Sequence, residues 1–147
     1  WVDIGSSFIP SDILAAFLYA QFEQREIIQS KRKKIWDHYY ANLEEWAIKA
    51  DIRLPFIPEY CEQPYHTFYL LMPSLEKRTA LIEHLKANRI NAVFHYLPLH
   101  LSIMGRKFGG KIGDLPIAEN ISDRVVRLPI YNDLNVDSLD FKCFYDF

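Results

Sequence analysis

The sequence predicts an α+β fold, in which one long helix is followed by a small sheet of about three strands and several shorter helices. From Ser11 to Leu54 the chain contains no proline or glycine, and most of its apolar residues recur at steps of three, four or seven, which is the period of a helix. Beyond Leu54, β-rich stretches alternate with helical ones. Half of the 147 residues are hydrophobic and 24% are charged, a globular composition that excludes a disordered chain.

Charge and cysteine content exclude further classes of protein. The 17 Lys and Arg and the 19 Asp and Glu give a formal net charge of −2, whereas a nucleic-acid binder normally carries a basic excess. The longest fully apolar run, Ile13–Ala20, is too short to span a bilayer. Cys61 and Cys143 match neither a disulfide framework nor a zinc motif. We expect them to be buried free thiols in a reducing, cytoplasmic compartment.

The first predicted element is a helix over about Asp12 to Ile48, with Ser11 as its N-cap. At 1.5 Å per residue it would be roughly 55 Å long, whereas a domain of this size has a radius of gyration of only about 15 Å. We therefore expect the helix to overhang its own domain or to bend. Its periodic apolar residues are Ile13, Phe17, Ala20, Ile27, Ile28, Ile35, Tyr39, Leu43 and Trp46.

The two halves of this helix differ. Ile13–Phe22 is apolar nearly all round and needs partners on both sides, so we expect it to face a further domain or a subunit. The basic run Lys31–Lys34 is interpreted as a solvated helix face. The chain begins at Trp1, and its first segment resembles the interior of a structure, so we expect a piece of a longer protein.

The remaining elements follow in alternation. A loop containing Pro55, Pro58 and Pro64 leads to the predicted strands His66–Met72, Ile90–Tyr96 and Val126–Ile130. Between the first two lies a helix over about Leu75 to Ala87, which begins after the N-cap Ser74 and stops at Asn88.

The rest of the chain predicts short elements. Four of the five glycines fall in Leu101–Gly113, which indicates a flexible loop. A short helix is expected from Pro116 to Val125, and Asn135 is expected to cap a final one. Ala80, Leu81, Ile82 and Leu85 are predicted to form the inner side of the 75–87 helix.

His95 and His100 are candidate site residues because they bracket the segment HYLPLH, where a strand meets a loop. Three interpretations remain open. Metal binding would need an acidic or cysteine ligand, and none lies between or beside them. A general base is possible for any histidine, although no Ser or Cys nucleophile motif is nearby. A structural histidine is the third, and it is also the interpretation of His66.

The segment Gly5-Ser6-Ser7 precedes the long helix. A small hydroxylated loop at a helix start can bind a phosphate through N–H groups and hydroxyls. It matches neither a full P-loop nor a dinucleotide fingerprint, so the sequence alone makes it a weak phosphate site.

Several ordered segments resemble the C-terminal part of DegT/StrS-type sugar aminotransferases. These are GSSFIPSDILAAFLYAQFE, HTFYLLMP, HLKANRINAVFHYLPLH and LPIAENISDRVVRLPIYNDL. The last resembles a family stretch of the form P-x-A-E … L-P, represented here by Pro116, Ala118, Glu119, Leu128 and Pro129. Together they cover nearly the whole chain.

The resemblance implies the small C-terminal α+β domain of a fold type I aminotransferase dependent on pyridoxal phosphate (PLP), with an antiparallel sheet and helices on one face. Residues 1–50 would link to a missing large PLP-binding domain, and residues 51–147 would form the small domain. The implied reaction transfers an amino group from glutamate to the 4-oxo group of dTDP-4-oxo-6-deoxyglucose. The implied partners are a second copy of the protein, its own large domain and the nucleotide-sugar substrate.

The resemblance also assigns residues. Ser7 matches a position, usually Asn in the family, that contacts the PLP phosphate of the partner subunit, and Ile9 replaces an Arg found in many relatives. His100 matches a position near the active site, and His95 and Tyr96 would line the sugar-nucleotide pocket.

The family's cofactor-binding lysine lies upstream of the matching region, so no catalytic residue is expected in this chain. The S-x-x-K strings at Ser30–Lys33 and Ser74–Lys77 are interpreted as chance. The alternative to an enzyme fragment is a stand-alone α+β binding or regulatory module.

Overall fold

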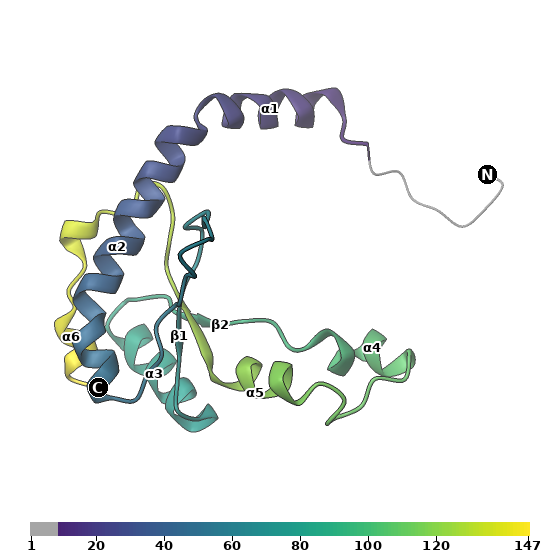
Figure 1. Ribbon diagram of the computed structural model, residues 1–147, viewed down its shortest axis with the longest axis vertical. Helices are drawn as coiled ribbons and strands as arrows, with labels where there is room; N and C mark the ends of the chain where they lie inside the picture. Colours follow the sequence, from purple (N-terminus) through teal and green to yellow (C-terminus); the bar gives the residue numbers. More distant parts are fainter. Residues whose placement is uncertain (1–8) are drawn as a thin grey trace.

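The structure, a computed structural model, describes residues 9–147 (Figure 1). Ser7 therefore lies outside the described residues. The elements in chain order are α1 (Asp12–Glu23), α2 (Arg25–Lys49), β1 (Phe68–Leu71), α3 (Leu75–Ala87), β2 (Val93–Phe94), η1 (Leu99–Leu101), α4 (Ile103–Lys107), α5 (Pro116–Arg124), β3 (Val125–Leu128), η2 (Val136–Ser138) and α6 (Lys142–Tyr145).

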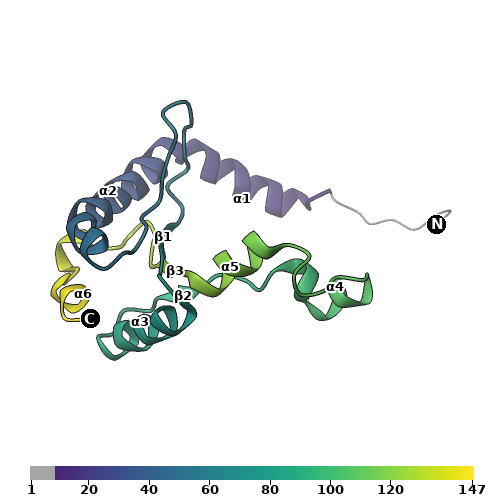
Figure 2. The ribbon, with the colours of Figure 1, turned by 60° about the horizontal axis from the view of Figure 1, so that its bottom comes forward.

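A three-stranded sheet lies at the centre, in the order β1-β3-β2. Both pairings are antiparallel, with Phe68 opposite Leu128 and Val93 opposite Arg127. Helices α2, α3 and α6 lie to one side of the sheet, and α1 and the α4–α5 segment project away from it (Figures 1 and 2). The predicted α+β class, with a small antiparallel sheet, is confirmed.

The predicted long helix is two helices that meet at Gln24. The Gln24 N–H donates to the Gln21 carbonyl at 3.2 Å, a tightened turn of the kind found at helix ends. The chain changes direction there (Figure 1). The expectation of a bend is confirmed, and so is the N-cap, since Ser11 Oγ accepts from the Leu14 N–H.

The core joins one stripe of α2 to the inner face of the sheet. Its largest fully buried side chains are Tyr39, Phe68, Leu43, Leu70, Met72, Leu81, Leu85 and Val126. The Tyr39 hydroxyl donates to the Pro129 carbonyl at 3.0 Å, and burial raises the pKa of this phenol. Burial of the α2 residues from Ile35 onward fixes that half of the helix to the sheet.

Helix α1 presents its apolar residues to solvent. Every residue from Asp12 to Glu23 is exposed, and Phe17 and Phe22 are 68% and 60% exposed. This agrees with the expectation that the first half of the helix needs partners beyond the small domain. Of the helices in residues 9–147, none combines the length and apolarity that a membrane crossing requires.

Several predictions about local structure were wrong in detail. The strand expected at Ile90–Tyr96 is reduced to Val93–Phe94, because the chain after it leaves β3. The expected loop Leu101–Gly113 contains α4, which begins after the N-cap Ser102. Cys61 and Ala80, expected inside, are exposed, whereas Cys143 is buried. Helix α3, with Ser74 and Asn88 at its ends, has the predicted bounds.

Candidate functional site

A largely apolar hollow of about 500 Å³ lies between the segment after β2 and helix α5. One wall is His95 and Tyr96 with the three residues that follow them, and the opposite wall comes from α5 and the start of β3. The lining residues are His95, Tyr96, Leu97, Pro98, Leu99, Ala118, Ile121, Ser122 and Val125. Two residues that the sequence singled out therefore share one cavity.

Polar and aromatic contacts fix the Tyr96 wall. The Ser122 hydroxyl on α5 donates to the Tyr96 carbonyl at 3.1 Å, which ties the two walls together. The rings of His95 and Tyr96 meet edge to face, with centroids 5.3 Å apart. From β3, the Arg127 guanidinium lies 5.8 Å from the centre of the Tyr96 ring, a distance typical of a cation–π contact.

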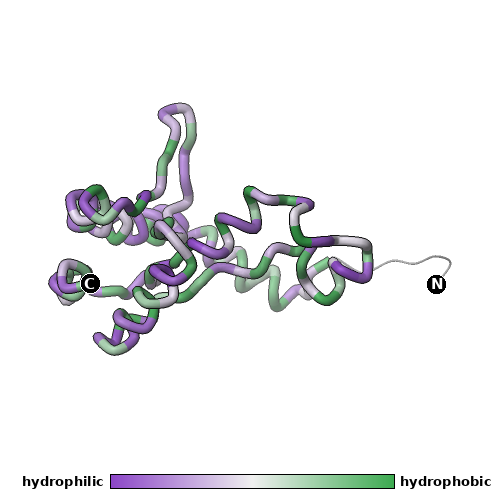
Figure 3. The backbone as a smooth tube through the Cα atoms, turned by 90° about the horizontal axis from the view of Figure 1, so that it is seen from below, coloured by the Kyte–Doolittle hydropathy of each residue, from purple (hydrophilic) through white to green (hydrophobic). Residues whose placement is uncertain are grey.

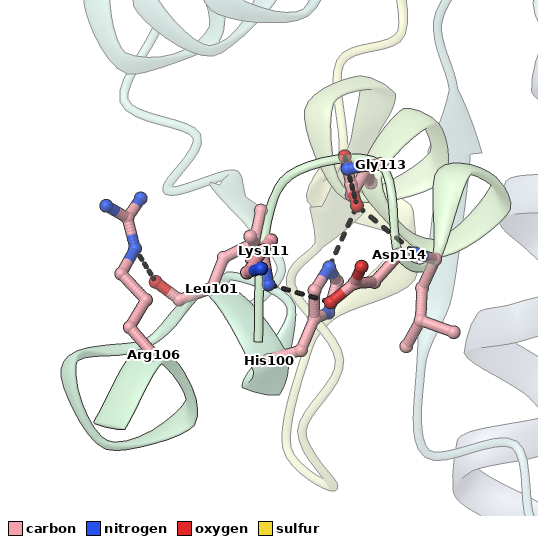
Figure 4. A network of polar contacts seen from close by, with 8 residues as sticks. His100, Leu101, Arg106, Lys111, Gly113 and Asp114 are labelled. Atoms are coloured by element: carbon pink, nitrogen blue, oxygen red, sulfur yellow. Dashed lines mark hydrogen bonds and ion pairs between the residues drawn. The ribbon is translucent and has the colours of Figure 1, made fainter. Parts of the chain in front are cut away.

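His100 contacts Glu119 of α5. Its Nε2 lies 2.9 Å from Glu119 Oε1, and the two side chains are only 12% and 17% exposed. The same carboxylate accepts from the Gly113 N–H at 2.9 Å and from the Leu115 N–H at 3.3 Å. Figure 4 shows these contacts converging at the start of α5. Glu119 thereby joins η1 to the turn that precedes α5.

The hydrogen bond from His100 lowers the pKa of Glu119, and the bonds from the two backbone N–H groups act in the same direction. An ionised carboxylate only accepts hydrogen bonds, so Nε2 of His100 must carry the proton that it shares with Glu119. Nδ1 is left as the ring's second polar atom.

The segment between η1 and α5 folds closely around the His100 backbone. A side-chain carbon at Gly105 would collide with the Leu99 carbonyl, and one at Gly110 with the His100 carbonyl. Arg106 Nε donates to the Leu101 carbonyl at 3.2 Å, and the Lys111 N–H donates to Asp114 at 2.8 Å, both visible in Figure 4. Two of the four glycines predicted to give flexibility, Gly105 and Gly110, instead permit close backbone packing.

The structure places the three candidate histidines in different surroundings. His95 lines the hollow, whereas His100 pairs with Glu119 and is absent from the hollow's lining. Within residues 9–147 there is no group of three or more His, Cys, Asp or Glu side chains placed to hold a metal ion. His66 is exposed.

The lysines of the two S-x-x-K strings do not have the environment of a nucleophile. Lys33 forms an ion pair with Asp37 at 2.5 Å, and that hydrogen bond raises the Lys33 pKa. A lysine activated to attack a carbonyl needs a lowered pKa. Lys77 is exposed and lies 5.8 Å from the centre of the Phe147 ring.

A second, smaller hollow of about 170 Å³ opens near the start of β1. Its polar lining comes from His66, Thr67, Asn91 and Arg127. The sequence indicates no role for Arg127, because it is a single charged residue in a predicted strand. Glu119 belongs to the P-x-A-E motif, but the sequence does not predict its pairing with His100, because 19 residues separate the two.

Comparison with known proteins identifies relatives along most of the chain. The sequence model of the DegT/DnrJ/EryC1/StrS aminotransferase family matches residues 2–141. An uncharacterized protein of Methanocaldococcus jannaschii, MJ1066, is 32% identical over 94% of this chain and 36% of its own length. The dTDP-4-amino-4,6-dideoxy-D-glucose transaminase of Escherichia coli is 29% identical over 85% of this chain and 34% of its own.

A solved structure shows the same fold. The PLP form of Spr1654, a putative sugar aminotransferase of Streptococcus pneumoniae, superposes with a TM-score of 0.74 at 24% identity, over 91% of this chain and 33% of that one. The chain thus spans about a third of the length of each of these three relatives.

Proposed function

The chain belongs to the DegT/DnrJ/EryC1/StrS aminotransferase family, and from that premise we propose that it is the C-terminal part of a PLP-dependent nucleotide-sugar aminotransferase. The proposed reaction moves an amino group from glutamate to the 4-oxo group of dTDP-4-oxo-6-deoxyglucose. The 29% identical E. coli relative, a dTDP-4-amino-4,6-dideoxy-D-glucose transaminase, supports a dTDP-sugar substrate. The proposed setting is a cytoplasmic homodimer.

The proposal divides the longer protein at the helices described here. Residues 1–50 would connect a large PLP-binding domain to the small domain of residues 51–147. Full exposure of α1 and the one-third coverage of the relatives support a large domain against α1. In this arrangement, the buried half of α2 would hold the connection rigidly to the small domain.

The cofactor would be held mainly outside this chain. We place the cofactor-binding lysine in the large domain, as the family resemblance implies. The raised pKa of Lys33 and the exposure of Lys77 agree with the interpretation of the two S-x-x-K strings as chance. Ser7 would contribute a hydrogen bond to the cofactor phosphate of the neighbouring subunit. PLP, when bound, supplies the electron sink that amino transfer requires.

The hollow beside Tyr96 is the observation that carries the proposal for this chain's own role. Its apolar lining suits the flat faces of a sugar or a nucleobase, and Tyr96 offers an aromatic face for stacking. His95 would donate or accept a hydrogen bond at the substrate. His100 would present its remaining ring atoms to the substrate, while its bond to Glu119 fixes the ring's orientation.

The test uses the complete reading frame that contains this chain. The purified protein is incubated with PLP, glutamate and dTDP-4-oxo-6-deoxyglucose, and the amino sugar and 2-oxoglutarate are measured by mass spectrometry. Equal amounts of both products support the proposal. Failure to consume this sugar while another 4-oxo nucleotide sugar is aminated would reject the substrate alone. A reading frame without a lysine-bearing cofactor domain would favour the alternative, a binding or regulatory module without catalysis.

A further inference from the structure

Arg127 occupies the middle strand of the sheet, on the face turned away from the core. It lies between Tyr69 of β1 and Val93 of β2 in the strand register. Side chains alternate along a strand, and the neighbouring Val126 and Leu128 are buried in the core. The Arg127 side chain therefore belongs to the outer face, which α2, α3 and α6 leave uncovered (Figure 2).

The Nε–H of Arg127 lacks an acceptor within residues 9–147. This nitrogen is buried, and none of the ion pairs found among these residues involves Arg127. Its observed contact is with the Tyr96 ring. Buried N–H groups are normally paired in native structures, and the Nε–H groups of Arg78, Arg124 and Arg127 lack such a partner among the described residues. Of these three arginines, Arg127 lines the hollow near the start of β1.

The hollow next to Arg127 is lined by residues that can donate hydrogen bonds. Thr67 offers a hydroxyl, Asn91 an amide and His66 a ring nitrogen. Among the described residues, no carboxylate lines it. A planar guanidinium with neutral donors around it matches the oxygens of a phosphate or carboxylate group.

We propose that this hollow, the Arg127 hollow, binds an oxyanion of the substrate, and that the diphosphate of the nucleotide sugar is its occupant. The inference rests on the proposed function. Arg127 contacts Tyr96, and Tyr96 lines the larger apolar hollow, so the two sites are neighbours. One substrate with an apolar ring and a diphosphate can therefore occupy both. The carboxylate of the amino donor has the same oxyanion chemistry and is distinguished experimentally.

The first experiment measures binding by this chain without any reaction. Inorganic pyrophosphate and glutamate are titrated separately while the backbone amide signals of Thr67 and Asn91, which line the hollow and are present in every variant, are followed by NMR. We expect saturable shifts with pyrophosphate, and an affinity reduced about tenfold to a hundredfold by Arg127→Gln, the range for a hydrogen bond to a charged group. Arg32→Gln, on α2, removes the same charge elsewhere and should leave the affinity unchanged. An unchanged far-UV circular dichroism spectrum shows that each variant is folded.

Equal affinity of the wild type and Arg127→Gln for pyrophosphate would overturn the proposal, and so would saturation by glutamate alone. Arg127→Lys keeps the charge and loses the planar fork, so its affinity should lie between those of the other two proteins.

The second experiment separates this inference from the proposed function. In the longer protein, Arg127→Gln should raise KM for the nucleotide sugar about tenfold or more, with KM for glutamate unchanged. If the wild type aminates the sugar and the variant keeps the same KM, the function stands and the anion site is rejected. If pyrophosphate binds through Arg127 but no nucleotide sugar is aminated, the site stands and the function is rejected.

Discussion

Glu119 is the residue on which the segment between η1 and α5 depends, because its carboxylate accepts hydrogen bonds from His100 and from two backbone N–H groups. These bonds lower its pKa in the folded state. A lowered folded-state pKa means that the stabilisation is present above the unfolded value of about 4.3 and is lost as the pH falls through the folded value.

We therefore expect Glu119→Gln to flatten the stability profile on the acid side. The free energy of unfolding in urea is measured from neutral pH down to about pH 3, below the ordinary glutamate pKa. The free energy of unfolding of the wild type should exceed that of the variant at neutral pH, and this difference should shrink below about pH 4. Glu44→Gln, at an exposed position of α2, is the control and should retain the wild-type slope. A difference independent of pH would contradict the assignment.

Arg89 has a left-handed backbone conformation, which leads to a prediction about stability. It follows the C-cap of α3 with φ +63°, and its neighbour Ile90 donates to the Leu85 carbonyl at 2.8 Å, as in a Schellman motif. Arg89→Gly should stabilise the fold by about 0.5–1 kcal/mol, since an L residue in this region costs about 1–2 kcal/mol and glycine's extra unfolded entropy offsets part of the gain. Lys86→Gly, inside α3, should destabilise by about 1 kcal/mol. The change in stability of both variants is measured by thermal unfolding.

Ser7 and His100 should contribute differently in the longer protein. Ser7→Ala should weaken cofactor retention about tenfold to a hundredfold, the effect of losing a hydrogen bond to a charged group. His100→Ala should lower kcat with little change in cofactor affinity, because we place it at the substrate. PLP titration and steady-state kinetics of both variants check this. Normal PLP binding by Ser7→Ala together with loss of PLP by His100→Ala would show that the roles are exchanged.

How far the site could be predicted depends on the residue. His95 and Tyr96 were placed together because adjacent positions must be close in space, and they do line one hollow. The pairing of His100 with Glu119 and the contact of Arg127 with Tyr96 join residues on different elements. Such contacts depend on how α5 and β3 return to the sheet, which local sequence does not determine.

Among the elements, α1 has the least support from its own domain. Its apolar residues are exposed, and burying a large apolar side chain contributes about 1.5–3 kcal/mol. We expect the isolated chain to self-associate through α1, and the double variant Phe17→Glu with Phe22→Glu to shift it towards monomer in sedimentation velocity. Phe56→Glu, at a position 81% exposed outside α1, should leave association unchanged. A monodisperse monomeric wild type would contradict this expectation.

Element prediction succeeded where local signals are strong. Ser74 and Asn88 flank α3 as expected, because capping depends on neighbouring residues alone. The segment rich in glycine failed for a physical reason: Gly105 and Gly110 lie against backbone carbonyls of Leu99 and His100. A glycine needed for close approach and one needed for flexibility look alike in a sequence.

At the scale of the whole molecule, two helical segments project from the sheet, and both carry exposed apolar residues. Green hydrophobic stretches occur along the α4–α5 segment in Figure 3, where Ile103, Phe108 and Ile117 are at least 79% exposed. With α1, this gives two apolar surfaces outside the core. Both would be covered in the proposed longer protein.

The isolated chain should consequently have no transaminase activity of its own. Incubation with PLP followed by borohydride reduction should leave no stoichiometric lysine adduct, because the proposed cofactor lysine lies in another domain. Intact-mass spectrometry measures the adduct, with the longer protein as the positive control. A single, fully occupied pyridoxyl-lysine in this chain would contradict the proposal.

The bend at Gln24 makes the number of residues in α2 a geometric constraint. Ile35 is the first deeply buried residue of α2. The stretch of α2 between Gln24 and Ile35 therefore sets the direction in which α1 projects around the α2 axis. One residue inserted there would rotate α1 by about 100° around the α2 axis and displace it by about 1.5 Å, while the core from Ile35 onward kept its contacts. Such an insertion should leave the free energy of unfolding of the small domain unchanged. It should disrupt the assembly of the longer protein. Spacing in this stretch is therefore constrained by what α1 docks against.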